Sequence, residues 1–307
     1  MMPCLLLFLL SHCIAVQDSG IGQNPERVSA VVNGWHIRQA RVDRFVSQKL
    51  GSRVVNDEVA KRMRSVALEH LIRRQVIMEY LKSTRHFPRD GSAVEMRIGS
   101  LQKRLARVDR TLQQHLVENG MSRAELENEI VWEIAWQGFL EDWLSESRLE
   151  KIFNDRHREL DGTRVKVAHL LLRPDENESL EQVYARATAI REEINQGSLT
   201  WAQAVGGSSV AQTSIEQEGL IGWIEFATPM PIRFSRAAFD LDPGQISKPV
   251  ETRAGIHLIK CLEVTPGSAG RKDVGPALRH AATEAVFFQL AEQHRSEVVI
   301  HYKEAEE

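Results

Sequence analysis

Apolar and polar residues alternate most clearly between residues 244 and 260, a stretch that reads GQISKPVETRAGIHLIK. Alternation with a period of two is typical of a strand with one buried face, so this stretch predicts two β-strands joined by a short turn. His257 lies in the second strand, and its side chain is expected to point to the opposite face from Ile256 and Leu258. The face that His257 occupies is therefore a candidate for chemistry.

The first half of the chain has a different pattern, in which apolar residues recur at helical spacing. Turn signals, capping residues and helix breakers divide this half into separate elements. The predicted elements are, in order, a short strand that ends at the Asn33-Gly34 turn, a helix that begins at Ile37, a helix from Asp57 to about Tyr80 capped by Asn56 or Asp57, a helical segment from Val94 to Leu116, and a helix that begins at Ser122 with Glu125 at capping-box spacing.

The pattern changes again after Asp161-Gly162, where short apolar strands alternate with amphipathic helices. The predicted elements are a strand at 165–172, a helix at 183–194, a strand at 219–224, a helix at 231–241 and the two strands of residues 244–260. Strands before, between and after helices within about a hundred residues predict an α+β domain. A Gly- and Pro-rich linker, a helix at 278–295 and a closing strand at 298–300 are predicted to follow.

Composition narrows the range of functions. Charged residues make up 26% of the chain and the formal net charge is −3, so the global basic field of a nucleic-acid-binding protein is absent. No cluster of cysteine and acidic residues offers metal-ligand spacing, and we expect neither a metal nor another cofactor. Cys261 is expected to be a small buried hydrophobic residue.

The N-terminus contains an apolar run from Leu5 to Leu10 followed by small residues near Ala15. This run is too short to span a bilayer, so an integral membrane protein is not expected, but it suits the core of a signal peptide over residues 1–15. An unprocessed apolar tail remains the alternative, because no basic residues precede the run. Lipid attachment at Cys13 is disfavoured because the bulky His12 precedes it. Export to the periplasm or cell envelope is the expectation.

His169 and His257 are the candidates for chemistry because both interrupt otherwise apolar strands of the α+β domain. Taken singly, such a histidine is more often a hydrogen-bonded core residue than a functional group. A metal site would need further ligands, and a hydrolase triad would need a nucleophile that nothing in the sequence marks. The two histidines are instead expected to face each other across a sheet.

The region from Val165 to Val264 resembles a parvulin-type (PpiC-type, rotamase) peptidyl-prolyl cis-trans isomerase domain. The resemblance rests on motifs that follow one another in the family's order. They are Ala168-His169-Leu170-Leu171, Glu218-Gly219-Leu220-Ile221-Gly222-Trp223, the run Met230, Phe234 and Ala237-Ala238-Phe239, and finally Gly244, Ile246-Ser247, Pro249-Val250, Thr252 and Gly255-Ile256-His257.

The resemblance implies an antiparallel sheet flanked by short helices, inserted into a mostly α-helical chaperone-like domain of the SurA/PrsA-like layout. The implied boundaries are a helical domain at 26–162, the isomerase domain at 164–265, and a C-terminal helix and strand at 276–307 that pack back on the helical domain. The implied partners are unfolded or partly folded polypeptides and their X-Pro segments. The implied catalytic residues are His169, Thr252 and His257, and the implied proline-binding residues are Ile221, Met230 and Phe234.

Three positions depart from the family pattern. Ala211, or Gln212 when the count runs back from Gly219, falls where an Asp or Cys is usual, and neither offers a thiolate or carboxylate. Leu220 replaces an Asp, and Pro231 stands where a Gln is common. The polar residue expected near the twisting carbonyl is therefore missing. Two functions remain open: an exported prolyl isomerase that assists protein folding, and a non-catalytic holdase chaperone whose domain only binds polypeptide segments.

Overall fold

The computed structural model describes residues 27–175, 178–209 and 217–303. Backbone contacts divide the chain into two compact units. The first combines the residues up to 143 with those from 283 onward, and the second comprises residues 144–282, so the second is inserted into the sequence of the first. Helices are combined with antiparallel sheets, which confirms the predicted α+β class. The predicted signal segment 1–15 lies outside the described residues.

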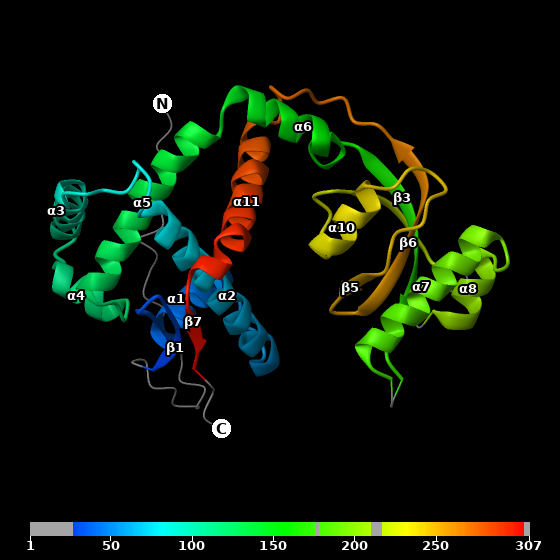
Figure 1. The fold of residues 1–307 in the computed structure, drawn as a ribbon, viewed down its shortest axis with the longest axis horizontal. Coiled ribbons are helices and arrows are strands. Elements are labelled where there is room, and N and C mark those ends of the chain that lie inside the picture. Colours follow the sequence, from blue (N-terminus) through cyan, green and yellow to red (C-terminus); the bar gives the residue numbers. More distant parts are fainter. Residues whose placement is uncertain (1–26, 176–177, 210–216, 304–307) are drawn as a thin grey trace. The chain divides into compact units, whose positions relative to one another are not determined.

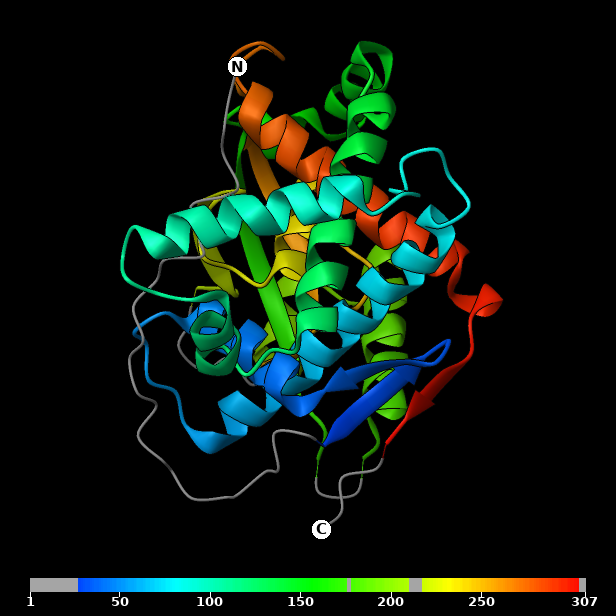
Figure 2. The same ribbon diagram turned by 90° about the vertical axis from the view of Figure 1, so that its left-hand side faces the viewer.

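A small antiparallel sheet brings the two ends of the first unit together (Figure 2). Its strand order is β2-β1-β7, with β1 at Val28–Val32, β2 at Trp35–Arg38 and β7 at Ile300–Tyr302. The Asn33 amide donates to the Val299 carbonyl, and the Asn33 side chain accepts from the Val299 amide. The C-terminal strand thus completes a sheet that begins at the N-terminal end of the described chain.

The helices of the first unit pack their apolar faces together and against this sheet. Asn56 caps the second helix by accepting from the Val59 amide, and Ser122 and Glu125 form the predicted reciprocal capping pair, so both predicted caps are confirmed. The helices are α1 at Gln39–Leu50, α2 at Asp57–Leu81, α3 at Ser92–Ala106, α4 at Leu112–Glu118, α5 at Arg123–Trp143, and the C-terminal part of α11 at Gly275–Gln293.

Three boundaries in this unit differ from the sequence prediction. Ile37 lies in β2, because the Asn33-Gly34 turn leads into a hairpin before the first helix begins. The predicted segment 94–116 is two helices, since Asp109 adopts a φ of 52° and Thr111 caps a new helix with a capping box. The closing strand begins at Ile300 rather than at residue 298.

The second unit is built around a four-stranded antiparallel sheet of order β4-β3-β6-β5. Figure 1 shows α7 and α8 on one side of this sheet and α10 on the other. The strands are β3 at Arg164–Leu172, β4 at Leu220–Glu225, β5 at Val250–Thr252 and β6 at Gly255–Thr265, and the helices are α6 at Glu146–Leu160, α7 at Leu180–Gln196, α8 at Trp201–Ser208 and α10 at Ile232–Phe239.

The two faces of this sheet bury different sets of side chains, as the predicted alternation requires. Ile256 and Leu258 pack with α7 and α8, whereas His257 contacts Phe234 of α10 on the opposite face. The prediction that His257 points away from its neighbours is confirmed. Cys261 has no exposed surface, as expected for a small buried hydrophobic residue.

Candidate functional site

His169 and His257 lie on adjacent strands and on the same face of the sheet. In the β3–β6 register, His257 stands opposite Leu171, which is two residues from His169 and therefore shares its face. The two Nδ1 atoms are 3.1 Å apart and the rings are stacked with centroids 5.3 Å apart. Thr252, on β5, places its Oγ1 2.7 Å from His257 Nε2. The three polar residues predicted for the site thus form one hydrogen-bonded chain.

The direction of this chain follows from the partners of the Thr252 hydroxyl. Oγ1 accepts from the Ala254 amide at 3.1 Å, and the Gly255 carbonyl is 3.5 Å away, beyond a good hydrogen-bond length. We therefore assign the hydroxyl as a donor to His257 Nε2, which leaves the proton of His257 on Nδ1 as the donor to His169 Nδ1. The proton of His169 then resides on Nε2.

The electrostatic environment keeps both imidazoles neutral at pH 7. Burial lowers the pKa of His257 to about 4, and the neighbouring His169 contributes to the same shift. Burial also lowers the pKa of His169. Each hydrogen bond of this chain contains a single proton, and each imidazole uses one nitrogen as an acceptor. Both rings must therefore be neutral, and the pKa directions agree with the assigned tautomers.

The apolar residues predicted for the site lie on the same face as the histidines. The Phe234 ring meets His257 edge-on at 5.3 Å and His169 edge-on at 6.1 Å between centroids. Phe234 is only 1% exposed, so it supports the imidazoles from within the core. Met230 and Ile221 pack against the same cluster and are partly exposed. A ligand approaching this face would meet Met230 and Ile221 before it reached Phe234.

Gly219, the residue before β4, fixes the position of His169 on β3. The His169 amide donates to the Gly219 carbonyl at 2.8 Å, and a Cβ on Gly219 would lie 2.1 Å from the His169 carbonyl oxygen. Gly219 also has a φ of +78°, which glycine adopts at little cost. Trp201 holds the preceding residue by donating from Nε1 to the Glu218 carbonyl at 2.9 Å. Only glycine fits where these two strands approach.

The sequence prediction missed the hydroxyl of Ser209, which accepts a hydrogen bond from the Leu171 amide at 3.2 Å. This contact ties the end of α8 to the strand that carries His169. Ser209 directly precedes residues 210–216, and Ala211 therefore lies outside the described residues. The signal that could have marked it is the family's Ser-x-Asp/Cys element, in which Ser209 stands two positions before Ala211.

Leu220 and Pro231 can be placed relative to the histidines. Leu220 is the register partner of Ala168, which packs on the face covered by α7 and α8. The side chain of Leu220 therefore lies on the face opposite His169, and its departure from the family pattern does not remove a polar group from the histidine face. Pro231 precedes the first residue of α10, where a missing amide costs no helical hydrogen bond.

Comparison with known protein families identifies the domain that carries this face. The description "PPIC-type PPIASE domain", of the Rotamase family, matches residues 169–263, a span that begins at one histidine and contains the other. These residues form a parvulin-type isomerase domain. The prediction from the sequence motifs is confirmed, and its fold is the antiparallel sheet with helices on both faces described above.

Proteins similar to this chain include longer ones. Chaperone SurA of Xanthomonas oryzae pv. oryzae is 24% identical over 280 residues, which cover 86% of this chain and 59% of that protein. A parvulin-like PPIase of Rickettsia bellii is 29% identical over 141 residues, covering 44% of this chain and 46% of that protein. The crystal structure of PrsA from Bacillus anthracis is 18% identical, with 75% of this chain and 96% of that chain covered at a TM-score of 0.39.

The chain therefore spans about 59% of the length of the SurA relatives that it matches. None of the helices in the described part of the chain is both long and apolar enough to cross a membrane. Within the same ranges no group of three or more histidine, cysteine or acidic residues is arranged to hold a metal ion.

Proposed function

We propose that this protein is an exported peptidyl-prolyl cis-trans isomerase that assists the folding of other proteins in the periplasm or cell envelope. The observation that carries the proposal is the hydrogen-bonded chain of Thr252, His257 and His169, which rests on Phe234 and is flanked by Met230 and Ile221. Its substrates would be unfolded or partly folded polypeptides that contain X-Pro bonds. The apolar run near the N-terminus supports export.

The chemistry required of such a site is modest. No covalent bond breaks when an X-Pro bond rotates, but the barrier is about 18–20 kcal/mol because amide resonance is lost. An enzyme lowers this barrier by binding the twisted amide more tightly than the planar one. An apolar surface must hold the proline ring while a hydrogen-bond donor or dipole stabilises the twisted amide.

The residues on this face can supply both functions. Met230 and Ile221 would contact the proline ring, and Phe234 would fix the imidazoles behind it. With Nδ1 of His169 accepting from His257, the Nε2 proton of His169 remains as a donor toward the twisted amide. Thr252 and His257 would act as positioning residues, because they set the tautomer and orientation of His169. Neutral imidazoles suit this task, since no proton needs to be transferred.

A proline-limited refolding reaction tests the proposal. The full chain should accelerate the slow refolding phase, and the variant with both His257→Ala and Met230→Ala should lose at least about tenfold of that acceleration, which corresponds to about 1.4 kcal/mol of transition-state stabilisation. The matched control carries His36→Ala and Met96→Ala, two exposed positions of the first unit, and should keep its activity. A full chain that gives no acceleration at high concentration would refute the isomerase proposal.

A non-catalytic holdase is the second candidate, and the identity of Ala211 favours it, because alanine offers no acid or thiol. A holdase would suppress the aggregation of an unfolded client without changing its proline-limited refolding rate. If Ala211→Asp then created isomerase activity, the missing side chain would explain the loss. If the natural chain is already fully active, the argument from Ala211 fails.

A further inference from the structure

A pocket of about 710 Å³ lies within the first unit, among residues of α1 to α5. Its volume falls in the range typical of sites for small molecules, about 300–1,000 Å³. Part of its wall is apolar, and the side chains that form this part are Phe45, Leu71, Met96, Leu101, Met121, Leu126 and Ile130. All residues that line the pocket belong to the first unit, so its shape does not depend on the isomerase domain.

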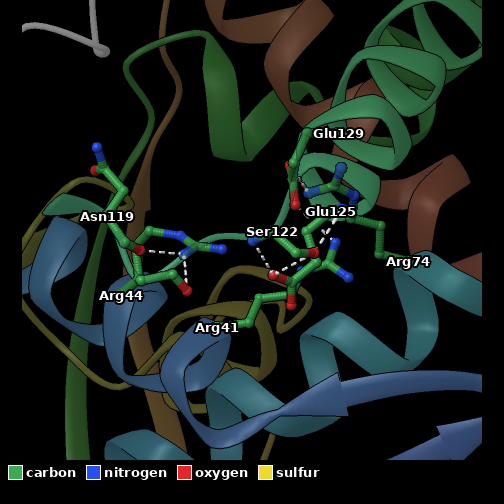
Figure 3. Close-up of polar contacts among 8 residues, drawn as sticks. Arg41, Arg44, Arg74, Asn119, Ser122, Glu125 and Glu129 are labelled. Carbon is green, nitrogen blue, oxygen red and sulfur yellow. Dashed lines mark hydrogen bonds and ion pairs between the residues drawn. The ribbon is translucent and has the colours of Figure 1, made fainter. Parts of the chain in front are cut away.

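Three arginines from two helices belong to the polar part of the wall. Figure 3 shows Arg41 and Arg44 reaching from α1, and Arg74 from α2, toward the first turns of α5 and the segment that precedes it. Arg41 Nη2 lies 2.7 Å from one oxygen of Glu129 and Arg74 Nη1 lies 2.6 Å from the other. Arg44 Nη1 donates to the Asn119 carbonyl at 2.5 Å. The carboxylate of Glu129 is therefore the shared ion-pair partner of two of the three guanidinium groups.

Several N–H groups of these arginines are buried and have no hydrogen-bond partner among the described residues. They are Nε and Nη1 of Arg41, Nη2 of Arg44, and Nε and Nη2 of Arg74. The side chain of Arg41 is only 4% exposed. Buried donors of charged groups are rarely left unpaired in folded proteins, because their lost hydration is not replaced. These arginines of the wall therefore keep donors without a hydrogen-bond partner among the described residues, although the Arg74 guanidinium also lies over the Trp132 ring, 4.9 Å from its centroid.

The side chains that line the pocket carry a net positive charge. Four more basic residues line the pocket with the three arginines, namely Arg97, Lys103, Arg104 and Arg107, against two acidic ones, Glu129 and Glu133. Seven positive and two negative side chains leave a surplus of five positive charges. Burial alone would raise the pKa of Glu129, but Arg74, Arg41 and Arg44 hold that pKa below the usual range. Glu129 is therefore ionised and is one of the two negative charges.

We propose that this pocket binds a carboxylate attached to an apolar group. The ligand would be either the free C-terminal end of a polypeptide with apolar last residues or a small carboxylic acid with an apolar tail. The paired Nε–H and Nη–H groups of a guanidinium match the two oxygens of a carboxylate, and Glu129 already binds two of these arginines. The apolar part of the wall would receive the rest of the ligand. This site is separate from the proposed isomerase function.

Calorimetric titration of the full chain with four probes tests the proposal. The first probe is the peptide N-acetyl-Ala-Leu-Ala-Leu with a free carboxylate, and the second is the same peptide as its C-terminal amide. Neither contains proline, the residue that Met230 and Ile221 are proposed to contact, and the variants described below assign any binding to the pocket. The third probe is decanoate and the fourth is inorganic phosphate, which has no apolar part.

The free-acid peptide or decanoate should bind, and the peptide amide should bind at least about tenfold more weakly than the acid because it loses charge-assisted hydrogen bonds. Binding of the peptide acid alone would identify polypeptide ends as the ligand, and binding of decanoate alone would identify free acids. Equal binding of acid and amide, phosphate binding as tight as that of the best carboxylate, or no binding of any probe would overturn the proposal.

Two variants locate the site. Arg44→Met leaves both partners of Glu129 in place and should weaken binding of the carboxylate probe at least about tenfold. Arg104→Gln with Arg107→Gln changes only the more exposed part of the wall and should weaken it severalfold without risk to the fold. Arg62→Gln, an exposed arginine of α2 outside the pocket, is the matched control. An equal loss of affinity in Arg62→Gln would refute the assignment to this pocket.

Discussion

Replacing Gly219 with alanine tests whether the close approach of the turn before β4 to β3 holds His169 in place. An alanine Cβ at this position would lie 2.1 Å from the His169 carbonyl oxygen, whereas real Cβ contacts are essentially never shorter than 3.0 Å. The two backbones must therefore separate by at least 0.9 Å, the difference between these two distances. That separation would also stretch the 2.8 Å hydrogen bond from the His169 amide to the Gly219 carbonyl.

The expected cost has two parts. An L-residue in a left-handed conformation such as the φ of +78° at Gly219 costs about 1–2 kcal/mol. Forcing extra volume into a packed region costs about 1–3 kcal/mol more. Gly222, within β4, has a φ of +99° but nothing within 4 Å of an added Cβ, so Gly222→Ala should cost only the conformational part. Gly219→Ala should therefore destabilise the domain by about 2–5 kcal/mol and Gly222→Ala by about 1–2 kcal/mol.

Hydrogen exchange measured by mass spectrometry on peptides from β3 isolates this domain from the rest of the chain. The free energy of opening should fall more in Gly219→Ala than in Gly222→Ala, by the difference of about 1–3 kcal/mol. If the protein has prolyl isomerase activity, that activity should fall together with the free energy of opening, because His169 shifts with its backbone. Equal losses of protection in the two variants would refute the argument that the contact with His169, rather than the φ angle, makes glycine necessary.

Three further perturbations have defined outcomes. Thr252→Val keeps the shape but removes the donor to His257 Nε2, and should lower any refolding acceleration by up to about tenfold while costing about 1 kcal/mol of stability. The urea-unfolding free energy should fall as the pH is lowered from about 6.5 to 4, and His257 should account for up to about 3 kcal/mol of this loss. The pKa of His257 is about 4 in the folded chain and 6.5 in the unfolded chain, so the unfolded chain binds the proton first. Glu129→Gln should cost about 3 kcal/mol in the urea-unfolding free energy, because Arg41 and Arg74 lose their shared counter-charge.

Each of these three outcomes has a control. Thr188→Val, on the exposed face of α7, should leave the refolding rate unchanged. His257→Gln should remove part of the acid-dependent loss, and an unchanged pH dependence in that variant would contradict the assignment to His257. Glu58→Gln breaks an exposed ion pair with Arg62 and should change stability by at most about 1 kcal/mol. An equal loss in Glu58→Gln and Glu129→Gln would contradict the argument from buried charge.

The extent of sequence-based prediction differed between the two units. In the second unit, strand alternation and the motif series located the sheet and the face of His257, because a period of two leaves little freedom in which side chains are buried. In the first unit, the segment 94–116 kept its helical spacing across a break at residues 107–111, so periodicity alone did not reveal two helices. Thr111 and Gln114 carried the signal of a new capping box, which the regular apolar pattern masked.

The sequence by itself determined which residues of the isomerase domain are apolar, which alternate, and which motif positions contain glycine, histidine and threonine. Only the tertiary structure decided that Thr252, His257 and His169 form one chain, because they come from three strands whose register sets the distances. The arginine pocket was likewise invisible in the sequence. Its members are 33 positions apart between Arg41 and Arg74 and 55 between Arg74 and Glu129, and only the packing of α1, α2 and α5 buries them together.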